Sequence, residues 1–242
     1  QGFQDKLKEL VEADGGSVEF DLQNASGESA NCTTIVNGFV SEGVDLIMAN
    51  ATAALQAAQA GPSDIPILGT SVTDYGTALG VSDWTGKTVA ILTGGGNNGG
   101  DGYALAAILA GKGIPCRLYR VSEKFSADGT FYYDQAIEAG VPADVFTKEK
   151  DLSGYDILVD CLLGTGFNGP VRGLFYEAIQ AINQSKAYVI SVDINSGMNG
   201  DTGKGGPVVK SDLTVTIGYL KAGMLLGDAV WSIGKLVVAD IG

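Results

Sequence analysis

The sequence contains no histidine, and this absence limits its chemistry. Histidine is the side chain whose ordinary pKa lies nearest neutral pH, and it is a common zinc ligand. Proton transfer near neutral pH must therefore fall to Asp, Glu, Lys, Tyr or a metal-bound water. Cysteines are few: Cys32, Cys116 and Cys161 are too widely spaced for a Cys-x-x-Cys pair, so we expect neither a zinc site nor a disulfide scaffold.

Basic residues and long apolar runs are also scarce. The 242 residues include 15 Lys and Arg against 28 Asp and Glu, which gives a formal net charge of −13. Such a surface repels phosphate backbones and no segment clusters basic side chains, so nucleic acid is not an expected partner. Gly, Asp or Thr interrupts each apolar run well before the roughly 20 residues that span a bilayer, so we expect a soluble protein with no membrane partner.

The acidic residues are unevenly distributed along the chain. Residues 1–86 carry 2 basic and 12 acidic side chains, whereas residues 87–242 carry 13 and 16. A Gly-, Ser- and Thr-rich stretch at 76–86 precedes a new strand pattern, so we predict a domain boundary there. The chain begins at Gln1 without an initiator Met or a charged-then-apolar leader, and we therefore expect it to be cut, processed or assembled.

Predicted strands alternate with predicted helices throughout the chain. Apolar runs predict strands at 17–22, 44–49, 65–69, 88–92, 116–121, 157–163, 189–192, 213–217 and 236–241. Helical spacing predicts helices at 3–13, 30–41, 51–60, 102–111, 131–139 and 174–183. This order predicts an α/β fold of three αβα layers, built on a mainly parallel, doubly wound, Rossmann-like sheet.

A glycine-rich segment, TGGGNNGGDG at 93–102, directly follows the predicted strand 88–92 and opens a helix. Backbone amides without a neighbouring Cβ can close on an anion, and a helix N-terminus adds partial positive charge, so the segment suits a pyrophosphate. It matches neither the G-x-G-x-x-G nor the G-x-x-x-x-G-K-[ST] fingerprint. The alternative is a glycine-rich turn that lets the strand and the helix pack closely.

Polar residues stand at the carboxyl ends of three later strands. Asp160 interrupts the apolar run ILVDCLL, Asp193 ends YVISVD, and Lys221 follows LTVTIGYL. A carboxylate within an apolar strand costs several kcal/mol unless it is paired or bound to a metal. Each aspartate alone could cap a helix or form a structural salt bridge, but strand ends that meet at one sheet edge also form an oxygen cage suited to a cation.

With these motifs in view, residues 87–242 resemble the NAD(P)HX epimerase family, also called the YjeF N-terminal domain. The resemblance rests on NNGGDG, VDCLLGTGFNGP, SVDINSG and SDLTVTIGYLKAG, which occur in the family's order. Family members are isomerases that interconvert the R and S epimers of hydrated NADH and NADPH and bind potassium. The resemblance implies a small-molecule dinucleotide partner and a cytoplasmic location for this part, and it allows a homodimer.

The resemblance also implies roles for individual residues. It implies that Asn98, Asp160 and Ser196 bind potassium. It also implies that Asp193 contacts the substrate and transfers the catalytic proton, and partial burial would raise the pKa of this aspartate. Asn195 stands where the family commonly has Pro, so the stiffness of this loop is expected to differ. The residues expected to hold the cofactor's phosphates and sugars are Asn97, Asn98, Gly99, Gly100, Asp101, Gly164, Thr165, Gly166, Phe167, Asn168, Gly169 and Pro170.

Residues 1–86 instead resemble part of the first lobe of a periplasmic substrate-binding protein of ABC transporters, in the branch associated with aromatic amino acids. The resemblance is carried by SVEFDLQNASGESANCTTIVNGFVSEGVDLIMANATAALQAA and IPILGTSVTDYGTALGVSDWTG. It implies an exported ancestor, although no signal peptide is present, and ligand contacts at 50–52, Ser71 and Thr73. The second lobe and the first strand of this lobe are missing, so a purely structural role is the alternative.

Two families joined within one chain predict an engineered or recombined chimera. The epimerase family's own N-terminal helices, which wall the pocket and form the dimer, are not recognisable in residues 1–86. We therefore expect the N-terminal strands to extend or flank the epimerase-like sheet, and Trp84 and Trp231 to be packing residues. Besides the epimerase, two functions stay open: a non-catalytic scaffold and an amino-acid-binding transport fragment.

Overall fold

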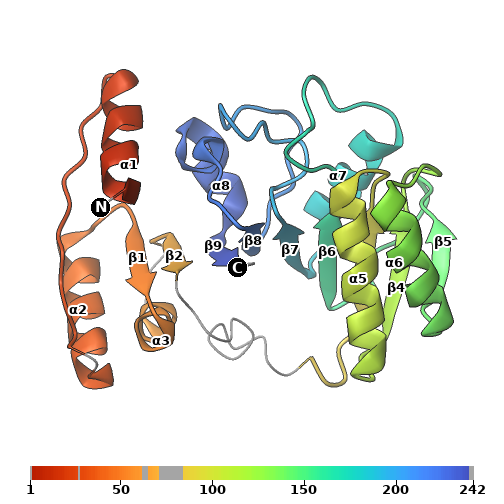
Figure 1. Ribbon diagram of the computed structural model, residues 1–242, viewed down its shortest axis with the longest axis horizontal. Helices are drawn as coiled ribbons and strands as arrows, with labels where there is room; N and C mark the ends of the chain where they lie inside the picture. The colour runs from red at the N-terminus through yellow and green to blue at the C-terminus, as the bar shows by residue number, and fades with distance from the viewer. Residues whose placement is uncertain (1, 27, 62–64, 71–83, 240–242) are drawn as a thin grey trace.

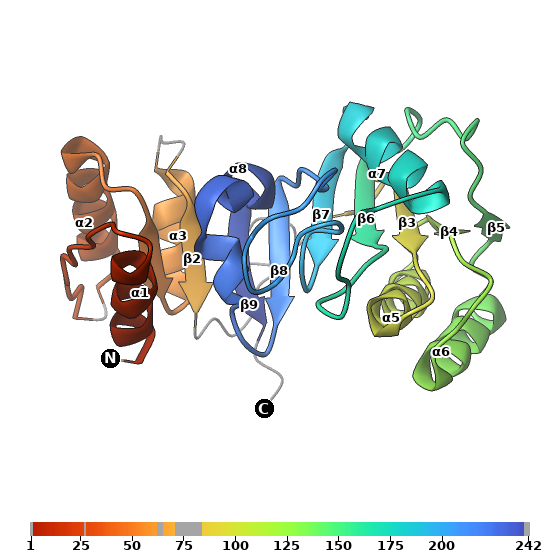
Figure 2. The ribbon, with the colours of Figure 1, turned by 90° about the horizontal axis from the view of Figure 1, so that it is seen from above.

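The computed structural model describes residues 2–26, 28–61, 65–70 and 84–239, and its centre is one nine-stranded sheet. All strand pairs are parallel, in the order β1-β2-β9-β8-β7-β6-β3-β4-β5. Figure 1 shows this arrangement, and Figure 2 shows β3 between β6 and β4. The strands are β1 (Ile47–Asn50), β2 (Ile67–Thr70), β3 (Val89–Thr93), β4 (Cys116–Arg120), β5 (Ala143–Val145), β6 (Ile157–Cys161), β7 (Tyr188–Val192), β8 (Leu213–Ile217) and β9 (Lys235–Ala239). The α/β fold expected from the sequence is therefore confirmed.

Helices cover both faces of this sheet, so the central strands can be apolar on both sides. All five residues of β3 and of β6 are buried. Figure 2 shows α7 on one side of the sheet and α5 and α6 on the other. The helices are α1 (Gly2–Ala13), α2 (Ser29–Glu42), α3 (Thr52–Ala60), α5 (Asn97–Gly111), α6 (Ala127–Glu138), α7 (Leu174–Gln184) and α8 (Val230–Ile233), with short 3-10 helices η1 (Ala222–Leu225) and η2 (Gly227–Ala229).

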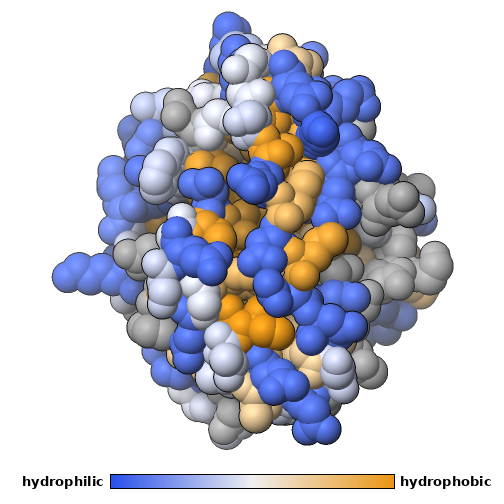
Figure 3. All heavy atoms as spheres, turned by 90° about the vertical axis from the view of Figure 1, so that its left-hand side faces the viewer, coloured by the Kyte–Doolittle hydropathy of each residue, from blue (hydrophilic) through white to orange (hydrophobic). Residues whose placement is uncertain are grey.

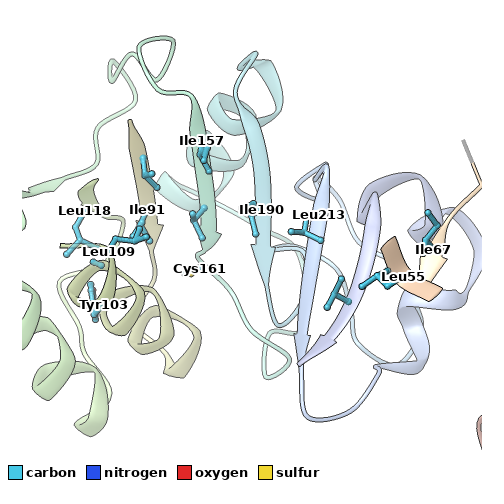
Figure 4. Packing of buried hydrophobic residues seen from close by; sticks show 14 of the residues in the cluster. Leu55, Ile67, Ile91, Tyr103, Leu109, Leu118, Ile157, Cys161, Ile190 and Leu213 are labelled. Carbon is cyan, nitrogen blue, oxygen red and sulfur yellow. The ribbon is translucent and has the colours of Figure 1, made fainter. Parts of the chain in front are cut away.

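The N-terminal strands extend the sheet of the C-terminal part, as expected. Strand β2 pairs with β9, with Leu68 opposite Leu236 and Gly69 opposite Val237. One core cluster runs from Leu55 and Ile67 in the N-terminal part to Leu213 and the strands beyond, and Figure 4 shows these side chains along the same face. The two parts thus share one hydrophobic core.

The strand predicted at 17–22 is wrong, because residues 16–25 form no helix or strand. Val18 and Phe20 are half-buried, while Glu19 and Asp21 are exposed. The alternating pattern therefore reflects the burial of one face, although the segment does not pair with a strand. Figure 3 shows apolar side chains along the middle of this end of the molecule, bordered by hydrophilic ones. Within the described residues β1 is the edge strand, so no other segment supplies the missing first strand.

Other differences from the expected pattern are smaller. Helix α5 begins at Asn97 rather than at residue 102, and the short strand β5 was not expected. Trp84 packs against the core as predicted, but Trp231 is 81% exposed, so the prediction that it packs is wrong. Most of the predicted boundary at 76–86 lies outside the described residues. Among the helices that can be described, none is long and apolar enough to cross a membrane.

Candidate functional site

The predicted site residues gather at the carboxyl edge of the sheet, where the strand order reverses. From β3 the chain continues outward through β4 and β5, whereas β6 lies on the other side of β3 and leads to β7, β8 and β9. The loops after β3 and β6 are therefore neighbours, and ligands of open α/β sheets bind at such a switch point. These two loops are the glycine-rich segments that the sequence singled out.

The first loop combines the two roles that the sequence left open. A Cβ on Gly94 would lie 1.9 Å from the Leu162 carbonyl oxygen, and one on Gly102 would lie 2.8 Å from Thr93 Cγ2. These glycines serve close packing of the strand and the helix, which is the alternative reading of the motif. Gly96, by contrast, has nothing within 4 Å of such a Cβ, and it immediately precedes α5. That position leaves the helix N-terminus open to an anion.

Asp160 is the centre of a buried polar cluster behind the loops. The side chain is fully buried on β6, and its Oδ2 accepts hydrogen bonds from Ser191 Oγ at 2.8 Å and from the Ser196 backbone N–H at 2.9 Å. Its Oδ1 accepts from Ser196 Oγ at 2.5 Å and from the Leu162 N–H at 3.2 Å. Burial raises the pKa of Asp160, although these four hydrogen bonds oppose the rise.

Asn98 brings a further oxygen to this cluster. Its Nδ2 donates to the Leu163 carbonyl at 3.1 Å, and Ser196 Oγ lies 3.2 Å from the same carbonyl oxygen. Asn98 Oδ1 is buried and has no hydrogen-bond partner. Buried polar oxygens are normally satisfied, so this unpaired amide oxygen calls for a cation or a water. The structure therefore brings the three predicted potassium ligands, Asn98, Asp160 and Ser196, into one cluster.

Asp193 stands at the end of β7 in an unusual backbone conformation. Its φ of +67° lies in the left-handed region, which non-glycine residues seldom adopt. The side chain forms an ion pair with Lys221, and its Oδ1 also accepts a hydrogen bond from the Ile217 N–H at 3.1 Å. Lys221 Nζ further donates to Thr216 Oγ1 at 2.8 Å and to the Ile217 carbonyl at 3.0 Å. Both charged side chains are therefore held in fixed positions.

A pocket of about 370 Å³ opens over this ion pair. It is lined by Asp101, Thr165, Asp193, Ile217, Tyr219, Leu220 and Lys221. Three of these residues, Asp101, Thr165 and Asp193, were predicted from the sequence. They come from the motifs NNGGDG, VDCLLGTGFNGP and SVDINSG, one from each. Tyr219, which is 88% exposed, was missed, and Lys221 was noted at a strand end without an assigned role.

The remaining predicted residues are not among those that line this pocket. Asn97 is exposed, whereas Asn98, Gly99 and Gly100 are buried at the start of α5. In the second loop Phe167 packs half-buried against the core. The other predicted residues of this loop do not line the pocket either: Gly164, Gly166, Asn168, Gly169 and Pro170.

Asp101 differs from Asp193 in its electrostatic surroundings. Burial against the pocket wall, followed by the nearby charge of Asp193, raises the pKa of the Asp101 carboxyl. Its side chain remains exposed on the solvent side. Two carboxyl groups with different surroundings therefore face one small pocket.

Asn195 explains how the loop after β7 is held without the proline that the family commonly has there. It is fully buried, and its Nδ2 donates to the carbonyls of Val209 at 3.0 Å and Ser232 at 2.7 Å and to Ser211 Oγ at 3.0 Å. Its Oδ1 accepts from Thr214 Oγ1 at 2.9 Å. Four hydrogen bonds to other segments thus fix the backbone between Asp193 and Ser196.

A larger cavity lies elsewhere and contains none of the predicted site residues. It measures about 700 Å³ and lies between α1 and the segment 198–210, with α8 and η2 beside it. The ligand contacts implied for the N-terminal part lie only partly within the described residues. Asn50 ends β1 and Ala51 has a φ of +77°, but Ser71 and Thr73 lie outside the described residues.

Comparisons with known proteins agree with this geometry. The family model described as YjeF-related protein N-terminus matches residues 45–223. The NAD(P)H-hydrate epimerase of Weissella koreensis is 34% identical over 165 residues, which cover 68% of this chain and 75% of that protein. The bifunctional NAD(P)H-hydrate repair enzyme Nnr of Thermofilum pendens is 37% identical over 163 residues, but the match spans only 31% of its length.

Solved structures support the same fold. The crystal structure of yeast ynu0 superimposes with a TM-score of 0.50 at 24% identity and covers 57% of this chain and 60% of that one. A substrate-binding protein from Clostridium difficile reaches a TM-score of only 0.32. The resemblance of residues 1–86 to such proteins therefore stays a prediction. The family match begins at residue 45, upstream of the boundary expected at residue 86, and includes the whole candidate site. The chain belongs to the YjeF-related protein N-terminus family.

Proposed function

We propose that this chain is an NAD(P)HX epimerase, an isomerase that interconverts the R and S epimers of hydrated NADH and NADPH. The proposal is supported by the family membership and by relatives that bear this name. The observation that carries it is the pocket at the switch point, where the ends of β6, β7 and β8 and the start of α5 meet around Asp193. A pocket of this kind is where an open α/β sheet accepts a dinucleotide.

Asp193 is the proposed proton-transfer residue. The epimeric centre is the hydroxyl-bearing carbon of the hydrated nicotinamide ring, and its inversion requires the hydroxyl to leave and to return. A fixed carboxylate at the base of the pocket can handle the proton of this hydroxyl. With no histidine in the chain, a carboxylate is one of the side chains that the composition leaves for the task.

The glycine-rich loops are proposed to hold the dinucleotide. The N-terminus of α5 presents backbone N–H groups beside the open Gly96, which suits the pyrophosphate. The exposed residues of the second loop, Thr165 among them, face the same edge and suit the sugars. Preformed contacts to the non-reacting parts of the substrate would position the ring over Asp193.

Potassium is proposed to bind at Asn98, Asp160 and Ser196, with the Leu163 carbonyl as a further oxygen. The residues fit the ion: Asn98 Oδ1 is buried and unpaired, and the set supplies one carboxylate together with neutral oxygens, which suits a monovalent hard cation. A bound cation would neutralise the buried Asp160 and would fix the loop that carries Thr165. It would thereby shape the pocket.

The potassium proposal is tested by melting the protein in KCl and in NaCl of equal ionic strength. We expect potassium to raise the melting temperature of the chain, because a ligand of the folded state stabilises it. Asp160→Asn, which keeps the shape of the side chain, should remove this difference. The exposed Asp134→Asn is the matched control and should keep it. A potassium effect that survives in Asp160→Asn would place the cation elsewhere.

We further propose that residues 1–86 serve a structural role in a recombined chain. The pairing of β2 with β9 and the shared core support this role, because they give the N-terminal part a packing function that needs no ligand. A homodimer and a cytoplasmic location are proposals supported by the family likeness alone. A melting-temperature rise with an aromatic amino acid, absent with a dinucleotide, would favour the transport-fragment function instead.

A further inference from the structure

Two carboxyl groups from different elements face the pocket. Asp101 lies in the first turns of α5, and Asp193 follows β7. The sequence motif grouped Asp101 with the residues that hold phosphates and sugars. Its position among the residues that line the pocket places it instead beside the proposed reacting centre, and its charge interacts with that of Asp193.

The two groups are held in opposite ways. Asp193 Oδ1 accepts hydrogen bonds from the Lys221 ammonium and from the Ile217 N–H, and no donor reaches its Oδ2 within the part of the chain that the structure describes. No described cation pairs with Asp101. Burial and the neighbouring negative charge raise the pKa of its carboxyl, so Asp101 holds a proton more readily than an ordinary aspartate does.

The other groups around Asp101 do not reverse this difference. Lys221 and Tyr219 line the same pocket, but Lys221 is engaged by Asp193, Thr216 and the Ile217 carbonyl. At the start of α6, the atoms nearest to the neighbouring Gly100 belong to the uncharged Gly129 and to Ser126, the N-cap of α6. Behind α5, on β6, the buried Cys161 thiol has its pKa raised by burial and by the charges of Asp160 and Asp101, so it is neutral.

We propose that Asp101 is a second catalytic residue, a proton donor that works with Asp193 as its complementary acceptor. This inference rests on the proposed epimerase function. Asp101 gives its proton to the ring hydroxyl, the C–O bond breaks, and water leaves as the ring-nitrogen electron pair forms a C=N bond. Water then adds to the other face of the carbon and gives its proton to Asp193. Solvent returns a proton to Asp101 and removes one from Asp193, so the net reaction is epimerisation alone.

The test is a set of pH profiles of kcat and KM for the full chain, Asp101→Asn and the control Asp134→Asn, with hydrated NADPH as substrate. A donor is active while protonated, so wild-type kcat should fall as the pH rises through the raised pKa of Asp101. Asp101→Asn should lower kcat by about 100-fold or more, leave KM nearly unchanged and remove this alkaline fall. If Asp101→Asn raised KM but kept the wild-type kcat and pH profile, the inference would be overturned. Asp101 would then be a residue that contacts a sugar or a phosphate.

A second readout does not depend on turnover. The carboxyl ¹³C resonance of Asp101 reports its titration directly, and in Asp193→Asn its pKa should fall towards the ordinary aspartate value. An unchanged titration would overturn the pairing of the two groups. If wild type and Asp134→Asn both fail to interconvert the epimers, the proposed function itself fails; if both are active and Asp101→Asn keeps full kcat, only the present inference fails.

Discussion

At the scale of single residues, the site depends on how firmly Asp193 is held. A non-glycine residue at positive φ costs about 1–2 kcal/mol, and such strain persists where the surrounding contacts enforce it. Here the enforcing contacts come from the end of β8, through the Ile217 N–H and the Lys221 ammonium. The strained backbone and the ion pair together aim the carboxylate into the pocket.

Removing the cation should therefore misplace the carboxylate. We predict that Lys221→Met lowers kcat by at least about tenfold, with a smaller effect on KM, because Asp193 then loses its charged partner. Steady-state kinetics measure this, with the exposed Lys112→Met as control. Wild-type kcat in Lys221→Met would show that the ion pair is not needed to position Asp193.

Asn195 provides a stability prediction at the same scale. Asn195→Ala removes four hydrogen bonds and leaves buried carbonyl and hydroxyl groups unpaired, so the free energy of unfolding should fall by about 2–4 kcal/mol. Urea denaturation measures the loss, and Asn37→Ala on the exposed face of α2 is the matched control. Equal stability of the two variants would mean that the loop is held by other contacts.

The motifs predicted the residues of the site better than their roles. Asn98, Asp160 and Ser196 do meet, because parallel strands end at one edge of a sheet. The contribution of Lys221 could not be read from the sequence, since it depends on β8 pairing with β7 in a register that brings Ile217 beside Asp193. Tyr219 was missed because a single aromatic residue after a strand carries no motif.

At the scale of elements, the start of α5 shows how one glycine-rich segment serves two purposes. Gly94, Gly99 and Gly102 lie where a Cβ would approach other atoms to 1.9, 2.2 and 2.8 Å, whereas Gly96 faces open space. Packing therefore uses Gly94, Gly99 and Gly102, while Gly96 stays free for the proposed contact with an anion.

These two uses can be separated by alanine substitution. Gly102→Ala should lower the free energy of unfolding by about 1–3 kcal/mol, because its Cβ would press on Thr93 and Cys161. Gly96→Ala should stay within about 0.5 kcal/mol of wild type in stability and should instead raise KM for the dinucleotide. Urea denaturation measures the free energy of unfolding, and steady-state kinetics measure KM. The opposite pattern, with Gly96→Ala unstable and Gly102→Ala impaired only in binding, would contradict this division.

The segment 17–22 shows where pattern reasoning about elements fails. Its alternation of apolar and acidic residues is typical of a strand, but a strand also needs a neighbour with free backbone groups. In this chain Val18 and Phe20 are half-buried, but the segment pairs with no strand among the described residues. The pattern identified the half-buried face correctly and could not reveal the missing partner.

At the scale of the whole molecule, the β2–β9 pairing makes the two parts one folding unit. Leu68 on β2 is buried in a cluster with Leu236, Ile194 and Met224, which belong to the C-terminal part. The charge imbalance and the two family resemblances suggested separate parts, but a shared core depends on long-range contacts that composition does not report.

A substitution in the N-terminal part should therefore destabilise the site-bearing part as well. We predict that Leu68→Ala lowers the free energy of unfolding by about 2–5 kcal/mol in a single transition, whereas Met48→Ala, at a residue 44% exposed, has a small effect. Near-UV and far-UV circular dichroism should follow the same urea curve. Two separate transitions, with the second unchanged in Leu68→Ala, would show that the parts fold independently.

The central claim is that the strand-end pocket catalyses epimerisation through Asp193. The most direct measurement follows the conversion of R-hydrated NADPH to the S epimer by chromatography, with wild-type protein and with Asp193→Asn, in potassium and in sodium. We predict conversion well above the spontaneous rate in wild type, faster in potassium, and at the spontaneous rate in Asp193→Asn. Conversion at the spontaneous rate in wild type would contradict the claim and would favour a fold that keeps the motifs of the family without its activity.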